Sequence, residues 1–254
     1  MELIIQKSIK YSVNDFFNKI IHLDYIDGIA LNIFKTKDNV LITFNLINNQ
    51  ESLLQNIYNS TYDNLQNLEV VKLETVINYL ESINYSKKVY LNLVPFRQLQ
   101  LTEEQNKVLM LEYEKYANNL ADILKNSKLN LYLHSVSRDL LDIVRTKEID
   151  CQFGFAIVGY DLNYIDVNYY VFTVEMLNFP LIKQELDLKK EVVIYIGNDY
   201  EMSLVYDLLF GSKKDKLANY IKDKISLMGN YPDLLQKTFL NEIKSIVKDT
   251  FFML

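Results

Sequence analysis

The sequence predicts one (β/α)8 barrel, and three observations lead to this fold class. Short apolar stretches typical of strands alternate along the chain with segments in which apolar residues recur at helical spacing. This alternation favours a parallel sheet, and about eight such units in 254 residues match the size of a (β/α)8 barrel. The alternative is an open doubly wound sheet. It is disfavoured because the loop after the first strand, Gln6-Lys7-Ser8, has no glycine for a nucleotide-binding turn. We therefore expect a single domain over residues 1–254.

The bulk composition restricts the classes of function. The chain is 49% hydrophobic, enough for a substantial core, and its formal net charge is -6 with no cluster of Lys or Arg. Binding nucleic acid requires a basic face, so we expect no nucleic-acid partner. The single cysteine, Cys151, excludes an intramolecular disulfide, and no apolar run approaches membrane-spanning length. The start, MELIIQKSIKYS, lacks the apolar core and cleavage site of a signal peptide, so we expect a cytoplasmic protein.

Apolar stretches bounded by polar or turn residues predict the strands. In chain order these are residues 3–5, 28–34, 40–44, 88–94, 129–133, 152–158, 167–174 and 191–196. The turn at residues 35–39 is rich in Lys, Asp and Asn, and it joins two of these strands. Pro95 ends another strand, because proline cannot donate to a strand ladder. Residues 47–69 are polar and rich in Asn and Gln, and we assign no helix or strand to them.

Apolar residues at helical spacing predict the helices. These are residues 13–21, 102–126, 139–145, about 179–186, and the tail 238–254. The longest has an apolar side suited to lying on the barrel, formed by Val108, Leu109, Leu111, Tyr113, Tyr116, Leu120, Ile123 and Leu124. Ser137 is the expected N-cap of the helix at 139–145. The tail is expected either to close the bottom of the barrel or to form a dimer contact.

Residues 25–46, YIDGIALNIFKTKDNVLITFNL, resemble the D-G-I-E-L-D-V…T-K-D-G-V-L-V-V-F-H-D signature of the glycerophosphodiester phosphodiesterase family. These are metal-dependent TIM-barrel enzymes that hydrolyse deacylated phospholipids. Weaker matches follow in the family's order from Leu3 to about Leu235, including VKLETVINYL, KVYLNLV, VVIYIGNDYEM and, for the eighth strand, KISLMGNYPDLL. The resemblance implies the same barrel over nearly the whole chain. It also implies that the inserted segment that walls the family's substrate site is largely missing at 47–69.

The residues that carry the family's chemistry are replaced. The family's three metal-binding carboxylates correspond here to Ala30, Asn32 and Val94. Its two catalytic histidines correspond to Gln6 and Asn45, and its phosphate-binding arginine to Lys7. Phe96 stands at a family lysine, with Arg97 next to it, and Asn230 at a usual aspartate. The family uses Ca²⁺ or Mg²⁺, so these replacements imply that the chain takes no metal cofactor and is a non-catalytic pseudoenzyme.

Two classes of function follow from this pattern. The first is a barrel that binds a small phosphate- or carboxylate-containing ligand, or a protein partner or second copy of itself. Its expected ligand-binding residues are Gln6, Lys7, Asn32, Asn45, Arg97 and His134. The alternative is a metal-dependent phosphoric diester hydrolase with a rebuilt site, using His134 or the later acids Asp161, Asp166, Glu175 and Asp199.

Several of these residues also have a purely structural interpretation. Lys7 and Arg97 can simply face water, the later acids can be solvated loop residues, and His134 can be a hydrogen-bonded structural histidine. His22 is expected on the surface or in packing, and Cys151 as an inert core thiol. The tyrosines, for example Tyr169, Tyr170 and Tyr195, are expected to pack in the barrel or under its helices.

Overall fold

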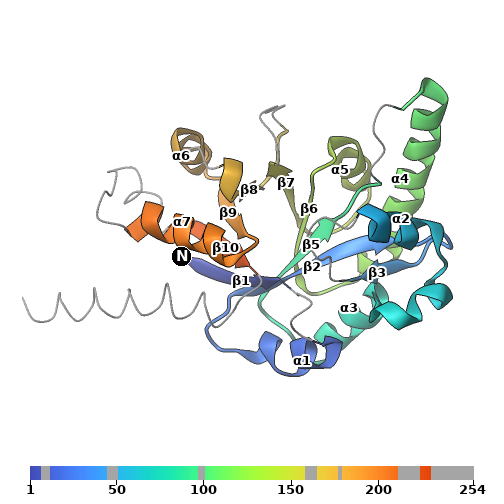
Figure 1. The fold of residues 1–254 in the computed structure, drawn as a ribbon, viewed down its shortest axis with the longest axis horizontal. Helices are drawn as coiled ribbons and strands as arrows, with labels where there is room; N and C mark the ends of the chain where they lie inside the picture. Colours follow the sequence, from blue (N-terminus) through green and yellow to red (C-terminus); the bar gives the residue numbers. More distant parts are fainter. Residues whose placement is uncertain are drawn as a thin grey trace, which may run out of the picture.

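The computed structural model describes residues 1–6, 12–44, 51–96, 101–157, 165–176, 179–210 and 224–229. Within these residues, eight parallel strands close into a barrel, because β1 pairs with both β10 and β2. Helices surround the strands (Figure 1), and the predicted fold class is confirmed. The barrel strands are β1 (Glu2–Gln6), β2 (Gly28–Lys35), β5 (Lys88–Leu93), β6 (Asn130–Ser135), β7 (Gln152–Ile157), β8 (Tyr169–Thr173), β9 (Glu191–Ile196) and β10 (Ile225–Gly229).

The strand β2 continues beyond the barrel into a small antiparallel extension. It pairs with β3 (Leu41–Thr43), which pairs with β4 (Val71–Lys72). Phe34 and Ile42 are Cα partners in this extension, and they pack with Ile57 and Leu65 in one buried cluster. This cluster explains why a polar segment without a predicted element forms α2 (Glu51–Asn59) and the 3-10 helix η2 (Tyr62–Leu68).

The remaining helices follow the strands they cover. They are α1 (Val13–Asn18), η1 (Ile20–His22), α3 (Leu73–Ser82), α4 (Glu103–Leu124), α5 (Arg138–Arg145), η3 (Val174–Met176), α6 (Phe179–Asp187) and α7 (Asp199–Phe210). The sequence analysis did not predict α7. Ser137 caps α5 as expected, because its hydroxyl accepts a hydrogen bond from the Leu140 backbone N–H. In the part of the chain that the structure describes, no helix is both long and apolar enough to cross a membrane.

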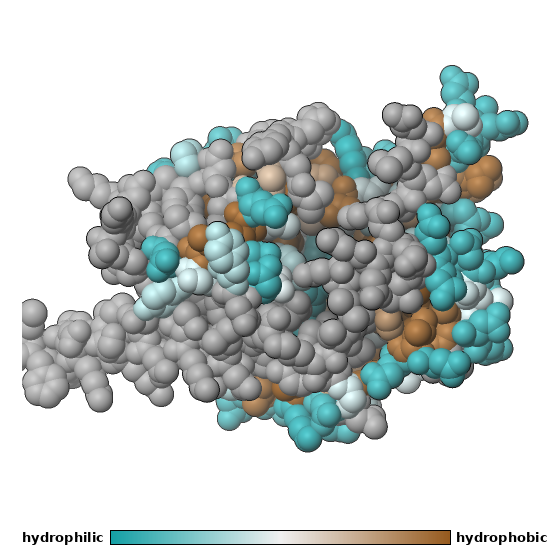
Figure 2. All heavy atoms as spheres, viewed as in Figure 1, coloured by the Kyte–Doolittle hydropathy of each residue, from teal (hydrophilic) through white to brown (hydrophobic). Residues whose placement is uncertain are grey.

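The helix α4 is partly anchored to the barrel and partly exposed. A capping box formed by Thr102 and Gln105 begins it, and the buried Tyr116 donates a hydrogen bond to the Ile33 carbonyl at 2.8 Å. Val108 and Leu111 were expected against the barrel, but 59% and 62% of their surfaces are exposed. The reason is that the first turns of α4 extend past the strands (Figure 1), where hydrophobic atoms lie among hydrophilic ones (Figure 2).

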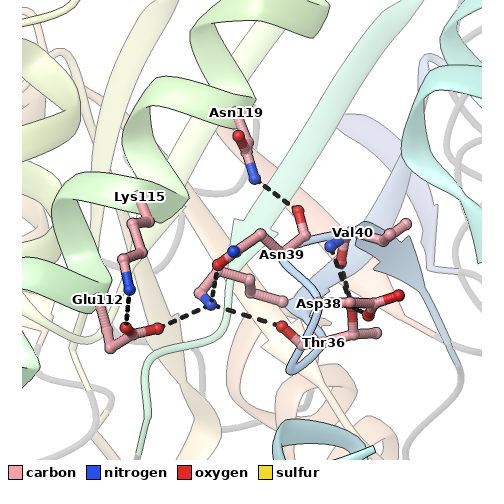
Figure 3. Close-up of polar contacts among 8 residues, drawn as sticks. Thr36, Asp38, Asn39, Val40, Glu112, Lys115 and Asn119 are labelled. Atoms are coloured by element: carbon pink, nitrogen blue, oxygen red, sulfur yellow. Dashed lines mark hydrogen bonds and ion pairs between the residues drawn. The ribbon is translucent and has the colours of Figure 1, made fainter. Parts of the chain in front are cut away.

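The turn between β2 and β3 is tied to α4 by polar contacts (Figure 3). Lys35, at the end of β2, is 2% exposed, and its Nζ forms an ion pair with Oε2 of Glu112 at 2.8 Å. The same Nζ donates to Oδ1 of Asn39 at 2.7 Å. The second carboxylate oxygen of Glu112 accepts from Lys115 at 2.6 Å. One buried cation therefore joins the end of a barrel strand to the helix that covers it.

The interior of the barrel is filled by an aromatic layer. Three buried tyrosines lie with their ring centroids 4.6 to 5.7 Å apart: Tyr90, Tyr132 and Tyr169. Ile4, Ala30, Ala156, Val171, Val193 and Met228 complete this inner cluster. Tyr169 thus packs in the barrel as expected, and the barrel is a packed core at this level.

Below the tyrosines, an ionic cluster joins three strands at their first residues. The ammonium group of Lys88 lies 2.9 Å from Oε2 of Glu2 and 3.0 Å from Oε2 of Glu191. It also lies 4.9 Å from the centre of the Tyr132 ring. Desolvation alone would lower the pKa of Lys88, but the two carboxylates raise it well above its ordinary value. This cluster fixes the N-terminal end of the barrel, opposite the end where TIM-barrel sites lie.

Candidate functional site

Polar residues on several neighbouring strands lie side by side, because they are paired in the strand register; we call this set of paired residues the register row. Asn32, Asn92, His134, Gly154 and Tyr169 are successive Cα partners across β2, β5, β6, β7 and β8. The row starts on β2, passes near the C-terminal ends of β5 and β6, and reaches the first residue of β8, as the stagger of a barrel requires. Parallel strands place the functional side chains of such a barrel at their C-terminal ends. The row is therefore the candidate site.

Three amide side chains form a hydrogen-bonded triad in this site. Oδ1 of Asn32 accepts from Nε2 of Gln6 at 3.1 Å and from Nδ2 of Asn92 at 2.8 Å. These residues come from β1, β2 and β5, and Gln6 is buried while the other two are half-buried. Both lone pairs of the Asn32 oxygen are engaged, so its amide group faces any ligand only as a donor of two hydrogen bonds.

Gln6 and Asn32 of this amide triad were predicted as site residues from the sequence, whereas Asn92 was not. Asn92 lies in the apolar stretch KVYLNLV, where the family resemblance pointed to Val94 instead. The available signal was the alternation of the strand, since Asn92 falls on the same face as the inward-facing Tyr90.

His134 is buried, and its side chain has a single hydrogen-bond partner among the residues that the structure describes. It is 3% exposed, and its Nδ1 lies 3.0 Å from the hydroxyl oxygen of Tyr169. Desolvation lowers the pKa of the imidazole to about 3, and burial raises the pKa of the Tyr169 phenol well above its ordinary value. Both groups are therefore uncharged at neutral pH, which agrees with the structural interpretation of His134.

The other two family carboxylate positions lie in apolar surroundings. Ala30 is 1% exposed in the inner cluster with Ile4 and Tyr90. Val94 packs against the cluster of Phe34 and Ile57 beside α2. The three positions that the resemblance matches to the family's carboxylates thus carry one amide and two alkyl side chains, two of them within β2 and the third directly after β5.

Comparison with known proteins gives a clear result at the level of structure. No protein-family model matches the sequence, and no curated protein does. A glycerophosphodiester phosphodiesterase from Parabacteroides distasonis is similar over 95% of this chain and 98% of its own, with a TM-score of 0.66 and 14% identity. A phosphodiesterase from Oleispira antarctica, in complex with the product sn-glycerol-3-phosphate, is similar over 94% and 96%, with a TM-score of 0.63 and 13% identity. The glycerophosphodiester phosphodiesterase of Thermotoga maritima gives 92% and 96%, a TM-score of 0.60 and 14% identity.

The chain has the fold of the glycerophosphodiester phosphodiesterases. This finding confirms the architecture that the motifs around residues 25–46 implied. It also justifies comparing the ends of the strands with the chemistry that the glycerophosphodiester phosphodiesterase fold supports elsewhere.

The residues that the sequence resemblance matches to the metal ligands of the glycerophosphodiester phosphodiesterases do not suit a divalent cation. Ca²⁺ and Mg²⁺ take oxygen ligands and favour carboxylates. Ala30 and Val94 have no side-chain oxygen, and that of Asn32 already accepts two hydrogen bonds. Across the described ranges, no three His, Cys, Asp or Glu side chains are grouped so as to hold a metal. These positions therefore form no ligand set for the metal that this enzyme family uses.

Of the acids proposed for a rebuilt site, Asp166 and Glu175 belong to no group of metal-ligating side chains within the described part of the chain. Asp166 forms an ion pair with Lys190 at 2.7 Å, Glu175 is exposed, and Asp199 begins α7. Asn198 caps α7, because its Oδ1 accepts from the Glu201 backbone N–H at 3.0 Å, and the Glu201 carboxylate accepts in turn from the backbone N–H of Gly197 at 2.8 Å.

Some of the remaining candidate residues lie in the described part of the chain, and others lie outside it. His22 is exposed in η1, as expected. Cys151 is half-buried, and burial raises the pKa of its thiol to about 12, so the thiolate that reactivity requires is not formed at neutral pH. Four predicted site residues lie outside the described residues: Lys7, Asn45, Arg97 and Asp161. Asn230 and the tail 238–254 also lie outside them.

Proposed function

We propose that this protein is a non-catalytic member of the glycerophosphodiester phosphodiesterase family whose barrel mouth binds a small phosphate- or carboxylate-containing ligand. The observation that supports the proposal most strongly is the amide triad. At the position of a family metal ligand, Asn32 has its oxygen engaged by Gln6 and Asn92 and its amide hydrogens left as donors. A group of that kind favours an oxyanion over a cation.

The same geometry argues against phosphodiester hydrolysis. General acid–base catalysis requires a group whose pKa lies near the working pH. His134, whose pKa is lowered to about 3 by burial, is too weak a base at neutral pH, and Tyr169 is its hydrogen-bond partner. Without the carboxylates that hold a divalent cation, the charge that develops on a phosphoryl group also has no counter-ion at Ala30, Asn32 or Val94.

Two further considerations support an anionic ligand. In sequence, Lys7 comes directly after β1, and Arg97 is separated from the end of β5 by Val94, Pro95 and Phe96; both are expected to contribute positive charge. In addition, the Oleispira antarctica phosphodiesterase with the same fold was solved with sn-glycerol-3-phosphate, a small phosphate ligand. We therefore expect the ligand to carry a terminal phosphate or carboxylate and to bind without metal.

Calorimetric titration with sn-glycerol-3-phosphate and with sulfate, in the presence of a chelator, tests this proposal. Wild-type protein is expected to bind, and the double variant Lys7→Ala/Arg97→Ala to bind at least about tenfold more weakly, because charge-assisted bonds are lost. The control is Lys125→Ala/Arg145→Ala, which removes the same charge from exposed residues on α4 and α5 and should leave affinity unchanged.

The variant Asn32→Asp sharpens this experiment. It preserves the volume and both incoming hydrogen bonds, and it replaces two donors by a negatively charged oxygen. Binding of either anion should be abolished. Absence of heat when wild-type protein is titrated with millimolar ligand would contradict anion binding and favour a protein partner instead. Val108 and Leu111 on α4 are among the exposed hydrophobic residues that such a partner could contact.

A further inference from the structure

We propose that Tyr169 is a positioning residue that holds His134 in a single tautomer, with the imidazole proton on Nε2 and with Nδ1 closed to any ligand. The site then offers a fixed hydrogen-bond donor at this position. The consequence for ligand choice rests on the proposed function, whereas the tautomer itself does not.

One hydrogen bond joins the side chains of His134 and Tyr169, with 3.0 Å between Nδ1 and the hydroxyl oxygen. If the phenol donates to Nδ1, the imidazole proton must lie on Nε2. If Nδ1–H donates instead, the buried phenol proton needs a second acceptor. Among the described residues Tyr169 has no hydrogen-bond partner other than His134, and the nearby hydroxyl of Tyr90 has none at all. Among the described residues, each arrangement leaves one hydrogen unpaired: the Nε2–H of His134 in the first, and the phenol hydrogen of Tyr169 in the second. The first is favoured because His134 keeps 3% of its surface exposed whereas Tyr169 is 0% exposed, and an unpaired donor costs most where it is fully buried.

Both groups keep the protonation that this argument requires. The titratable side chains in ring contact with His134 are Tyr90 and Tyr169, with ring centroids 6.5 and 5.9 Å away. Burial raises the pKa of both phenols, so neither becomes an anion that would attract a second proton to the imidazole. Desolvation keeps His134 neutral, and a neutral imidazole has one proton to place.

A glycine makes this contact sterically feasible. Gly154 lies between His134 and Tyr169 in the register row, as the Cα partner of both. A Cβ atom at this position would lie 2.3 to 2.5 Å from carbons of the Tyr169 ring, which is impossible without moving the ring. The tyrosine therefore reaches across the strand at Gly154 to meet the histidine two strands away.

The consequence for the site is a restriction on the ligand atom that can meet His134. Nε2–H accepts no hydrogen bond, and Nδ1 is occupied by Tyr169. Together with the two Asn32 amide hydrogens, the site pairs with acceptor atoms such as phosphate or carboxylate oxygens. An ammonium or hydroxyl donor at the same place would find no acceptor on either group.

Nitrogen NMR of the labelled full chain tests the inference directly. In wild-type protein, the His134 resonances should show a protonated Nε2 and an unprotonated Nδ1, with His22→Gln used to assign the signals. Tyr169→Phe should move both nitrogens toward the averaged shifts of a tautomer mixture, and Gly154→Ala should do the same by displacing the ring. Tyr170→Phe is the matched control, because it removes a buried tyrosine hydroxyl that donates to the Ile165 carbonyl and does not contact His134.

The outcomes separate the two proposals. A protonated Nδ1 in wild type, or shifts unchanged in a folded Tyr169→Phe protein, overturns the inference. If wild type has the expected tautomer but binds no sn-glycerol-3-phosphate or sulfate, the proposed function fails and the tautomer assignment stands. If both hold, Tyr169→Phe should lose affinity for the phosphate while Tyr170→Phe retains it.

Discussion

Glu112→Ala is expected to lower the free energy of unfolding by about 2 to 3 kcal/mol, because it leaves a buried ammonium group without its carboxylate. Lys35 is 2% exposed, and its partner Glu112 is 31% exposed at the side chain. Burial alone would raise the pKa of Glu112, but the ammonium groups of Lys115 and Lys35 lower it below its ordinary value. In the variant, Nζ of Lys35 retains Asn39, the Thr36 carbonyl and the face of Phe96, none of which carries negative charge.

Removing the other partner of this ion pair, Lys35, should lower the free energy of unfolding much less. Lys35→Met removes the charge, keeps an unbranched side chain of similar length, and leaves Glu112 paired with Lys115 (Figure 3), so we expect a change below about 1 kcal/mol. Lys115→Met, which breaks the exposed ion pair to the same carboxylate, is the control and should cost below about 0.5 kcal/mol. Urea unfolding followed by circular dichroism measures all three. A greater loss in Lys35→Met than in Glu112→Ala would contradict this expectation, and would show that the hydrogen bonds from the ammonium group to Asn39 and the Thr36 carbonyl stabilise the protein more than its pairing with Glu112.

Acidification should destabilise the protein through His134 before the carboxylates protonate. The folded-state pKa of about 3 lies below the value of 6.5 for an ordinary imidazole. Between these values the unfolded chain binds a proton that the folded chain does not, so lowering the pH favours unfolding. The contribution is present in full above pH 6.5 and is lost as the pH falls, at up to about 1.4 kcal/mol per pH unit.

Denaturant unfolding between pH 6.5 and 5 measures this dependence. The slope should be steep in wild type and nearly flat in His134→Gln, whose amide does not titrate. His22→Gln, at an exposed position in η1, should keep the wild-type slope. Equal slopes in wild type and His134→Gln would contradict the burial of an uncharged imidazole.

The barrel could be predicted from sequence because its strands are buried on both faces and are separated by segments with helical periodicity. Residues 191–196, for example, match β9 without any change of boundary. The helix α2 could not be predicted in this way. Its Asn- and Gln-rich segment is helical because Ile57 packs against Phe34 and Ile42, which lie on strands distant in sequence.

The candidate site shows the same division. Gln6 and Asn32 could be named because the family resemblance matches them to functional positions, and His134 because it follows the apolar stretch 129–133. Asn92 and Tyr169 are the hydrogen-bond partners of Asn32 and His134. Their contacts depend on strand register and on the space left by Gly154. A contact such as His134 to Tyr169, across 35 positions of sequence, has no local signal. For the same reason, the sequence left the role of His134 open between ligand binding, catalysis and structure, and did not identify Tyr169 as its partner.

The proposed function requires that this barrel does not hydrolyse phosphodiesters. Its most direct test is phosphorus NMR of the purified full chain with a glycerophosphodiester substrate, in Ca²⁺, in Mg²⁺ and in chelator. We expect no release of sn-glycerol-3-phosphate above a protein-free blank under any of the three conditions. The side chains of Ala30, Asn32 and Val94 provide no carboxylate for a metal, and burial makes His134 too weak a base at neutral pH. Metal-dependent release that is retained by Lys35→Met and abolished by His134→Ala would contradict the account and establish a rebuilt active site.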